Sequence, residues 1–147
     1  DSDGDGMADW FELQYFGNMD RDGSGDWDGD NLTDLEEYRN GTSPTDMDTD
    51  GDSIIDDQDV FPTDPNEWQD TDGDGTGDNA DTDDDDDGMP DDWEELYNGP
   101  DPLISDASED PDGDGWSNLL EYKRKTDPGD ANSHPSGAVP WILLLLE

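Results

Sequence analysis

The sequence has no cysteine and only 5 lysine and arginine residues among 147, against 46 aspartate and glutamate residues. Without cysteine no disulfide can stabilise the fold, and zinc–thiolate sites are excluded. The formal net charge of -41 at pH 7 repels phosphate, so nucleic acid is an unfavourable partner. Hydrophobic residues make up 27% of the chain, well below the roughly 45–50% of an ordinary globular domain. A conventional hydrophobic core is therefore not expected.

The composition leaves three classes open: a disordered chain, an acidic buffer or tail, and a fold whose core is made by bound cations. Low hydrophobicity with high net charge is the usual signature of disorder. Two features disfavour disorder here, because the chain carries 6 Trp, 4 Tyr and 3 Phe, and Asp outnumbers Glu about fourfold. An acidic tail has no need of the shorter side chain, whereas a short carboxylate in a tight turn points inward toward a cation. The third class is therefore favoured.

The first twelve residues, D-S-D-G-D-G-M-A-D-W-F-E, match the calcium-loop pattern D-x-D-x-D-G-x5-E at every position. Such a loop binds its ion through oxygens of positions 1, 3, 5, 9 and 12 and through the backbone carbonyl of position 7. Gly6 supplies the flexible backbone that the sharp turn needs. The predicted ligands of this first loop are Asp1, Asp3, Asp5, the Met7 carbonyl, Asp9 and Glu12.

The same pattern recurs five more times, which an acidic low-complexity tract does not explain. Asn31 and Ser53 replace the position 6 glycine in the second and third loops, and of the two only Asn readily tolerates left-handed backbone. The predicted ligands, with the position 7 carbonyl in each set, are Asp26, Asp28, Asp30, Leu32, Asp34 and Glu37; Asp48, Asp50, Asp52, Ile54, Asp56 and Asp59; Asp70, Asp72, Asp74, Thr76, Asp78 and Asp81; Asp83, Asp85, Asp87, Met89, Asp91 and Glu94; and Asp110, Asp112, Asp114, Trp116, Asn118 and Glu121.

An oxygen-only ligand set indicates a hard divalent cation, since the one histidine, His134, lies outside every loop. Calcium fits six or seven flexible oxygens better than magnesium does. Six calcium ions would offset only about a third of the chain's charge, so up to ten ions are expected. A further ion is expected at Asp20, Asp22 and Ser24, which precede the second loop at the same two-residue spacing. Asp46, Asp84 and Asp86 are the remaining candidates for extra ligands.

The loops divide the chain into four parts. Residues 1–47 and 83–131 each hold two loops, and amphipathic helices are expected after these loops at 8–16, 33–39, 91–97 and 117–124. Residues 48–82 hold the third and fourth loops, which end in Asp, and are expected to be irregular backbone wrapped on ions. Residues 132–147 form a tether and an apolar C-terminal strand. The expected fold is a mostly irregular calcium-stabilised repeat array with short α-helices and EF-hand-like loops, and with little other β structure.

The aromatic and leucine side chains of the expected helices are interpreted as small local cores between paired loops rather than as a ligand groove. Trp27 and Trp116 lie inside loops and Trp68 in the spacer, where a flat ring can cover an ion shell. The side chains expected in the local cores are Trp10, Phe11, Phe16, Leu35, Tyr38, Trp93, Leu96, Tyr97, Leu119, Leu120 and Tyr122.

The stretch from Asp48 to Asp81 resembles the bacterial thrombospondin type 3 repeat through Phe61-Pro62, Asp64-Pro65, Glu67-Trp68 and Gly77-Asp78-Asn79-Ala80-Asp81. The flanking D-G-D-G-x-x-N-x-x-E-Y pieces resemble related calcium-repeat and dockerin-like loops of secreted bacterial proteins, so that the resemblance covers about residues 1–133. It implies a calcium-rich extracellular or cell-surface stalk, spacer or fibre, with the loop ligands named above. Partner binding of the dockerin kind is not carried over, because the sequence offers no recognisable partner-binding face.

The apolar run of residues 138–146 is about half as long as a helical membrane span, so no span is expected in this chain. Three interpretations stay open: the first strand of a following domain, part of a sorting or anchoring tail, and a strand donated to a neighbouring subunit. A row of leucines in water would aggregate, so another surface is expected to cover it. Docking on a neighbouring copy would give a linear homopolymer, and docking on an adjoining domain would not.

The sequence thus predicts a structural calcium-binding module, a rigid stalk or filament subunit whose folding is driven by its ions. The alternative is a calcium-dependent adhesin or dockerin-like tether. An enzyme is not expected, because there is no nucleophile–base pair and the loop carboxylates are committed to ions. A calcium sensor would expose a methionine-rich groove, whereas the 4 methionines here are scattered.

Overall fold

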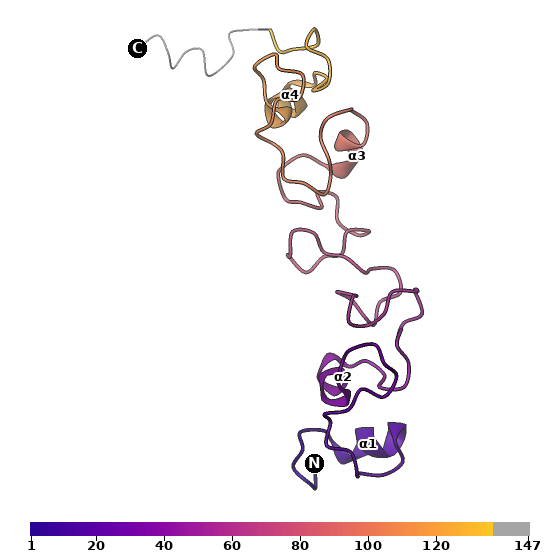
Figure 1. The fold of residues 1–147 in the computed structure, drawn as a ribbon. Helices are drawn as coiled ribbons and strands as arrows, with labels where there is room; N and C mark the ends of the chain where they lie inside the picture. The colour runs from indigo at the N-terminus through magenta and orange to yellow at the C-terminus, as the bar shows by residue number, and fades with distance from the viewer. Residues whose placement is uncertain (137–147) are drawn as a thin grey trace. The chain divides into compact units, whose positions relative to one another are not determined.

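The computed structural model describes residues 1–136, which form four short helices and no strand (Figure 1). The helices are α1 (Asp9–Tyr15), α2 (Asp34–Asn40), α3 (Asp91–Glu94) and α4 (Asn118–Arg124). Turns, bends and irregular backbone make up the rest of these residues. The prediction of a mostly irregular fold with short helices is therefore confirmed, whereas the predicted C-terminal strand lies outside the described residues.

Each helix begins at position 9 of a predicted loop, so the loop's last ligand stands on the first helical turn. Local sequence sets the helix ends. Thr33 and Glu36 form a capping box at the start of α2, and Gly41, at φ 83°, ends that helix in the left-handed conformation. The shortest helix, α3, ends at Glu94 rather than at the expected Tyr97. The amides of Leu96 and Tyr97 reach carbonyls only three residues back, and Leu96, 72% exposed, buries no apolar face that would extend the helix.

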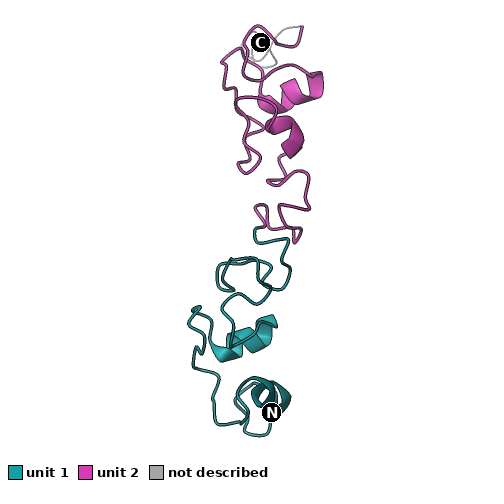
Figure 2. Cartoon of the chain, turned by 90° about the vertical axis from the view of Figure 1, so that its right-hand side faces the viewer, with its two compact units in different colours: residues 1–69 teal, residues 70–147 magenta. Residues whose placement is uncertain are grey.

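The chain divides into two compact units, unit 1 (Asp1–Gln69) and unit 2 (Asp70–Glu147), shown in teal and magenta in Figure 2. Unit 1 contains the first three loops with α1 and α2. Unit 2 contains the other three loops with α3 and α4. The division falls within the predicted spacer, between its two loops.

Aromatic rings join the two helices of each unit. In unit 1 the Phe11 ring lies 5.1 Å from the Tyr38 ring, and in unit 2 the Trp93 ring lies 5.1 Å from the Tyr122 ring, both measured between centroids. These contacts agree with the expected local cores between paired loops. Two expected members are mostly exposed, Trp10 at 62% and Leu96 at 72%, although the Trp10 ring still lies 6.4 Å from the Tyr38 ring.

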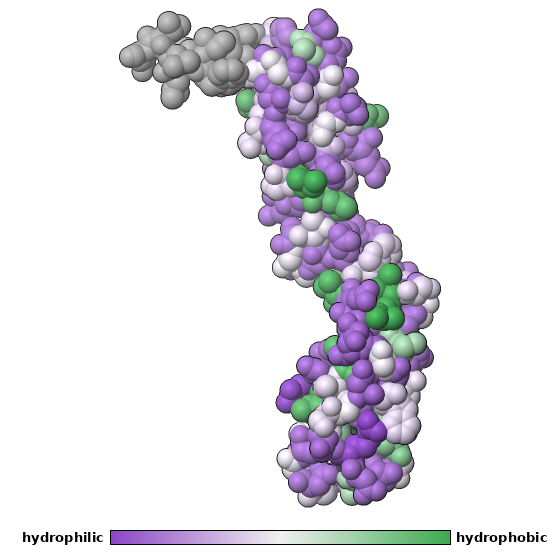
Figure 3. Space-filling view, in the orientation of Figure 1, coloured by the Kyte–Doolittle hydropathy of each residue, from purple (hydrophilic) through white to green (hydrophobic). Residues whose placement is uncertain are grey.

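Few hydrophobic side chains are buried. Among residues 1–136 they are Met7, Phe11, Met89 and Trp116. Hydrophilic residues cover most of the visible surface in Figure 3, interrupted by small apolar patches. No helix in the described part of the chain has the length and apolar character to cross a membrane. The interior of each unit must therefore be built mainly from something other than hydrocarbon.

Candidate metal centres

Carboxylate–amide hydrogen bonds organise each loop, and the sixth loop shows the pattern. Asp110 accepts hydrogen bonds from the amides of Gly113 and Gly115, at 2.8 and 2.9 Å. Asp112 accepts one from the amide of Asp114, at 3.0 Å. The second, third and fourth loops repeat these bonds with their own residues. Each such bond joins residues two to five positions apart, so the spacing of Asp in the sequence is enough to set it.

Eight carboxylates at positions 3 and 5 use one oxygen in this way and keep the other free, whereas Asp87, at position 5 of the fifth loop, uses both, because its Oδ2 accepts hydrogen bonds from the amides of Asp106 and Ala107. In the third loop, for example, Asp50 and Asp52 each have a buried Oδ2 atom with no hydrogen-bond partner. The complete set of such atoms at positions 3 and 5 is the Oδ2 of Asp5, Asp28, Asp30, Asp50, Asp52, Asp85, Asp112 and Asp114. A buried oxygen without a partner is unfavourable, so this recurring set points to a cation at the loop centres.

The glutamates at position 12 are more deeply buried still. Glu12, Glu37 and Glu121 are 0% exposed and Glu94 is 1% exposed, and neither carboxylate oxygen of any of the four has a hydrogen-bond partner. In the third loop the Oδ2 of Asp59, at position 12, is likewise buried and without a partner. Burying an ionised carboxylate without a counter-charge costs several kcal/mol. A cation at each loop would offset the cost of burying these position 12 carboxylates, and the same loop position recurs in every case.

The acidic oxygens of a loop also lie close together. In each of several groups of three, one carboxylate oxygen per residue lies within 4.8 Å of the others. The groups from the first four loops are Asp1, Asp3 and Asp5; Asp26, Asp28 and Asp30; Asp48, Asp50 and Asp52; and Asp70, Asp72 and Asp74. Carboxylate oxygens at this separation, with a buried carboxylate at position 12, fit a calcium-sized hard cation.

Burial and neighbouring carboxylates shift the acidity of these groups in the cation-free fold. Burial, and after it the charges of nearby aspartates, raise the pKa of Glu37 and of Glu94 to about 8. Burial likewise raises the pKa of Glu121 to about 7 and that of Asp85 to about 6. Without a cation, the loops therefore hold protons near neutral pH that an exposed carboxylate would have lost.

These shifts give the stability of the fold opposite pH dependences with and without calcium. In calcium-depleted protein the folded state binds more protons than the unfolded state between pH about 4.5 and about 8, so stability falls as pH rises through that window. With calcium present, protons compete for the same oxygens, so stability rises with pH over the same window. Thermal unfolding at pH 5 and pH 8, with and without calcium, measures both slopes. Equal slopes under the two conditions would contradict the assignment of these glutamates as ligands.

Positions 6 and 4 of the loops adopt left-handed backbone. Asn31 at φ 86° and Ser53 at φ 87° take the conformation of the glycine they replace, so both turns form. Position 4 is glycine in five loops, whereas in the fifth loop Asp86 occupies it at φ 51°. Left-handed backbone was predicted at position 6 alone, although the repeated glycine at position 4 is visible in the sequence.

The position 9 aspartates of three loops are held by the residue at position 2. Both of their oxygens accept hydrogen bonds, one from the backbone amide and one from the hydroxyl of a Ser or Thr, so the structure directs them to the loop's start. The amide and hydroxyl distances are 2.7 and 2.6 Å for Ser2 to Asp9, 2.8 and 2.7 Å for Thr49 to Asp56, and 2.8 and 2.8 Å for Thr71 to Asp78. These donors were not predicted, although Ser or Thr recurs at position 2 of the loops.

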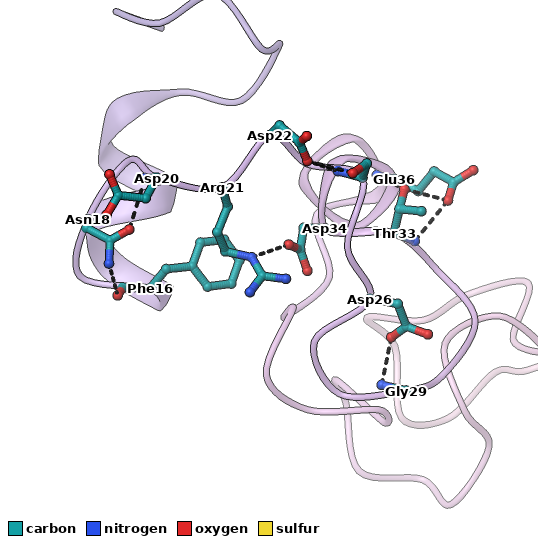
Figure 4. A network of polar contacts seen from close by, with 11 residues as sticks. Phe16, Asn18, Asp20, Arg21, Asp22, Asp26, Gly29, Thr33, Asp34 and Glu36 are labelled. Atoms are coloured by element: carbon teal, nitrogen blue, oxygen red, sulfur yellow. Dashed lines mark hydrogen bonds and ion pairs between the residues drawn. The ribbon is translucent and has the colours of Figure 1, made fainter.

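Position 9 of the second and sixth loops faces other partners. Asp34 is 0% exposed and contacts the guanidinium of Arg21, which lies over the Phe16 ring at 4.7 Å (Figure 4). The same guanidinium lies over the Trp27 ring at 4.6 Å. In the sixth loop, Asn118 donates a 2.9 Å hydrogen bond to Asp106, a buried acid outside every predicted loop. Both residues were predicted ligands of their own loops, and the structure joins them to residues that precede those loops.

The fourth loop and the extra site before the second loop are more open. Asp72 and Asp74 are exposed, and the carboxylate of Asp81 accepts hydrogen bonds from the amides of Thr82 and Asp83. At the extra site Asp20, Asp22 and Ser24 are all exposed. The carboxylate of Asp22 accepts hydrogen bonds from the amide and the hydroxyl of Ser24, whereas the amide of Asp20 donates a hydrogen bond to the side chain of Asn18 (Figure 4). The structure thus pairs Asp22 with Ser24 but gives no buried cluster there.

Comparison with protein-family models, with curated proteins and with solved structures found no match to this chain. The geometry of the loops is therefore the basis for any functional conclusion. The resemblance to the thrombospondin type 3 repeat stays a prediction.

Proposed function

We propose that this chain is a structural calcium-binding module whose folding is driven by bound calcium. The observation that carries the proposal is the set of four position 12 glutamates, each at most 1% exposed and each with two oxygens lacking hydrogen-bond partners. A cation bound at each loop would offset the cost of burying these carboxylates without a counter-charge. The donor set consists of carboxylates and backbone carbonyls, which suits calcium.

Ions would supply folding energy that the apolar residues cannot. Only four hydrophobic side chains are buried among the described residues, whereas eleven polar or charged residues are. Without cations the buried carboxylates repel one another and favour an extended chain. When cations bind only the folded state, their binding free energy becomes folding free energy.

The role we propose is that of an extracellular or cell-surface spacer, a rigid stalk or a filament subunit. Extracellular calcium is abundant enough to fill even sites with dissociation constants of about 10⁻⁴–10⁻³ M. Loops filled at every repeat would stiffen backbone that has little regular secondary structure. The apolar C-terminal segment, outside the described residues, would then dock on a neighbouring subunit or an adjoining domain.

Metal removal tests this function. With chelator the helical circular dichroism and the aromatic near-ultraviolet signal are expected to collapse, and millimolar calcium is expected to restore both. Each site filled at 100 times its dissociation constant would add about 2.7 kcal/mol to the free energy of unfolding. Magnesium at the same concentration is the control, expected to restore less because it requires octahedral coordination. Spectra and melting temperature unchanged by chelator would rule out ion-driven folding.

A second candidate is a calcium-dependent adhesin or dockerin-like tether. The observation that favours it is the exposure of Trp10 and Leu13 on α1, at 62% and 54%. Apolar side chains exposed on one short helix suit contact with a partner protein. Replacing both by serine would then abolish retention of a partner while leaving the calcium-dependent spectra intact. If the chain is a purely structural module, the double serine variant would behave like the unmodified chain in the retention assay.

A further inference from the structure

One group of buried acids crosses from the second loop to the third. Asp30, Glu37 and Asp56 each offer a carboxylate oxygen within 4.8 Å of the other two. Asp30 and Glu37 are 0% exposed and Asp56 is 4% exposed. The first two are positions 5 and 12 of the second loop, whereas Asp56 is position 9 of the third. Asp56 is therefore closer to the second loop's ion position than its place in the sequence implies.

The oxygens that meet there lack partners. Both carboxylate oxygens of Glu37 and the Oδ2 of Asp30 are buried without any hydrogen bond. The guanidinium of Arg21 forms its ion pair with Asp34 instead. Three carboxylates thus enclose a space in which a positive charge would be strongly favoured.

The backbone holds Asp56 in that place. Its amide donates to the Met47 carbonyl at 2.9 Å, and Thr49 fixes its carboxylate through two hydrogen bonds at 2.8 and 2.7 Å. Thr49 is itself anchored, because its hydroxyl oxygen accepts the amide of Ser43, at 2.8 Å. The chain that follows α2 therefore folds back so that the third loop presents Asp56 to the second. A carboxylate accepting two hydrogen bonds keeps lone pairs that can coordinate an ion.

We propose that Asp56 is a shared ligand, which completes the cation site of the second loop from within the third loop and so couples the two sites. The site takes calcium, and this inference rests on the proposed function of the loops. A shared carboxylate explains how two loops with few apolar contacts fold as one part of unit 1. Occupancy of either loop then favours the arrangement that the other needs.

The test is a calcium titration of the isotopically labelled full chain, followed by nuclear magnetic resonance. Amides of Gly29 and Leu32 report on the second loop, those of Gly51 and Ile54 on the third, and that of Gly73 on the fourth. For Asp56→Asn, the calcium midpoint of the second loop is expected to rise about tenfold. The matched control is Asp78→Asn in unit 2, which loses an equivalent Thr-held carboxylate and should leave the second loop unchanged.

A second variant separates a ligand from an indirect effect. Asp59→Asn weakens the third loop at position 12 but leaves Asp56 and Thr49 in place, so the second loop's midpoint should rise less than about threefold. The shared site is overturned if Asp56→Asn raises the calcium midpoint of the third loop alone. It is also overturned if Asp59→Asn raises the midpoint of the second loop as much as Asp56→Asn does. If the amide resonances of the unmodified chain do not shift when calcium is added, the proposed function is overturned, and the shared site with it.

Discussion

Glu94→Gln is expected to destabilise unit 2 when calcium is present and to stabilise it when calcium is removed. Glu94 is 1% exposed, both of its oxygens lack hydrogen-bond partners, and burial raises its pKa to about 8. With calcium bound, the change removes a charged ligand, and a 10–100-fold loss of affinity corresponds to about 1.4–2.7 kcal/mol. Without calcium, folded Glu94 must keep a proton up to a pH of about 8 because it is buried and faces Asp85, Asp87 and Asp106. The unfolded chain has lost that proton at neutral pH, so glutamine removes the cost of holding it.

The neighbouring residue provides a matched control. Glu95 follows Glu94 directly and is exposed, so Glu95→Gln should change stability by less than about 0.5 kcal/mol in either condition. Thermal unfolding and hydrogen exchange of residues 83–97, in calcium and in chelator, measure the effects. The reversal of sign is the decisive result. A variant that is equally destabilised in both conditions would mean that Glu94 has a packing role unrelated to a cation.

Gly23→Ala is expected to destabilise unit 1 by about 2–5 kcal/mol, whether or not calcium is present. Gly23 is buried at φ 70°, and an added Cβ would lie 2.9 Å from the Leu35 Cβ and 3.5 Å from the Met7 side chain. Its carbonyl also accepts the Leu35 amide at 3.1 Å, at the start of α2. Left-handed backbone in alanine and the close contact both oppose the native arrangement of the first two loops.

Gly17→Ala isolates the backbone contribution. Gly17 has a similar φ of 75°, but an added Cβ there has no atom within 4 Å. Only the conformational cost applies, about 1–2 kcal/mol. Calorimetry of the two variants, with hydrogen exchange of residues 23–40, gives the difference. If both variants lose the same stability, the contact between Gly23 and Leu35 does not join the loops as the structure indicates.

Much of the candidate site follows from the sequence because its interactions are local. The aspartates at positions 1, 3 and 5 bond to amides two to five residues away, so their spacing alone arranges them. Position 12 falls on the first turn of a helix, where a fixed rise brings the glutamate back to the loop. The irregular fold, with short helices after four loops, follows from the same spacing and from the scarcity of apolar residues.

Two local features were visible and were still missed. Ser2, Thr49 and Thr71 at position 2 hold the aspartate at position 9, and glycine recurs at position 4. The calcium-loop pattern assigns position 9 to the ion, and that assignment concealed the competing hydroxyl donors. Positions 2 and 9 are joined by irregular backbone, whose geometry the helical and strand periodicities do not describe.

The sequence by itself determined that the chain holds repeated acidic loops, that hydrocarbon cannot form its core, and which acids end each loop. These results depend on composition and on spacing within twelve residues. Only the tertiary structure decided which loops touch. Asp56 meets Asp30 and Glu37, and Asp106 meets Asn118, because the chain folds back between loops. Such contacts join residues 12 to 26 positions apart through turns whose direction no local pattern specifies, so the buried acids between loops appeared only once the backbone was placed.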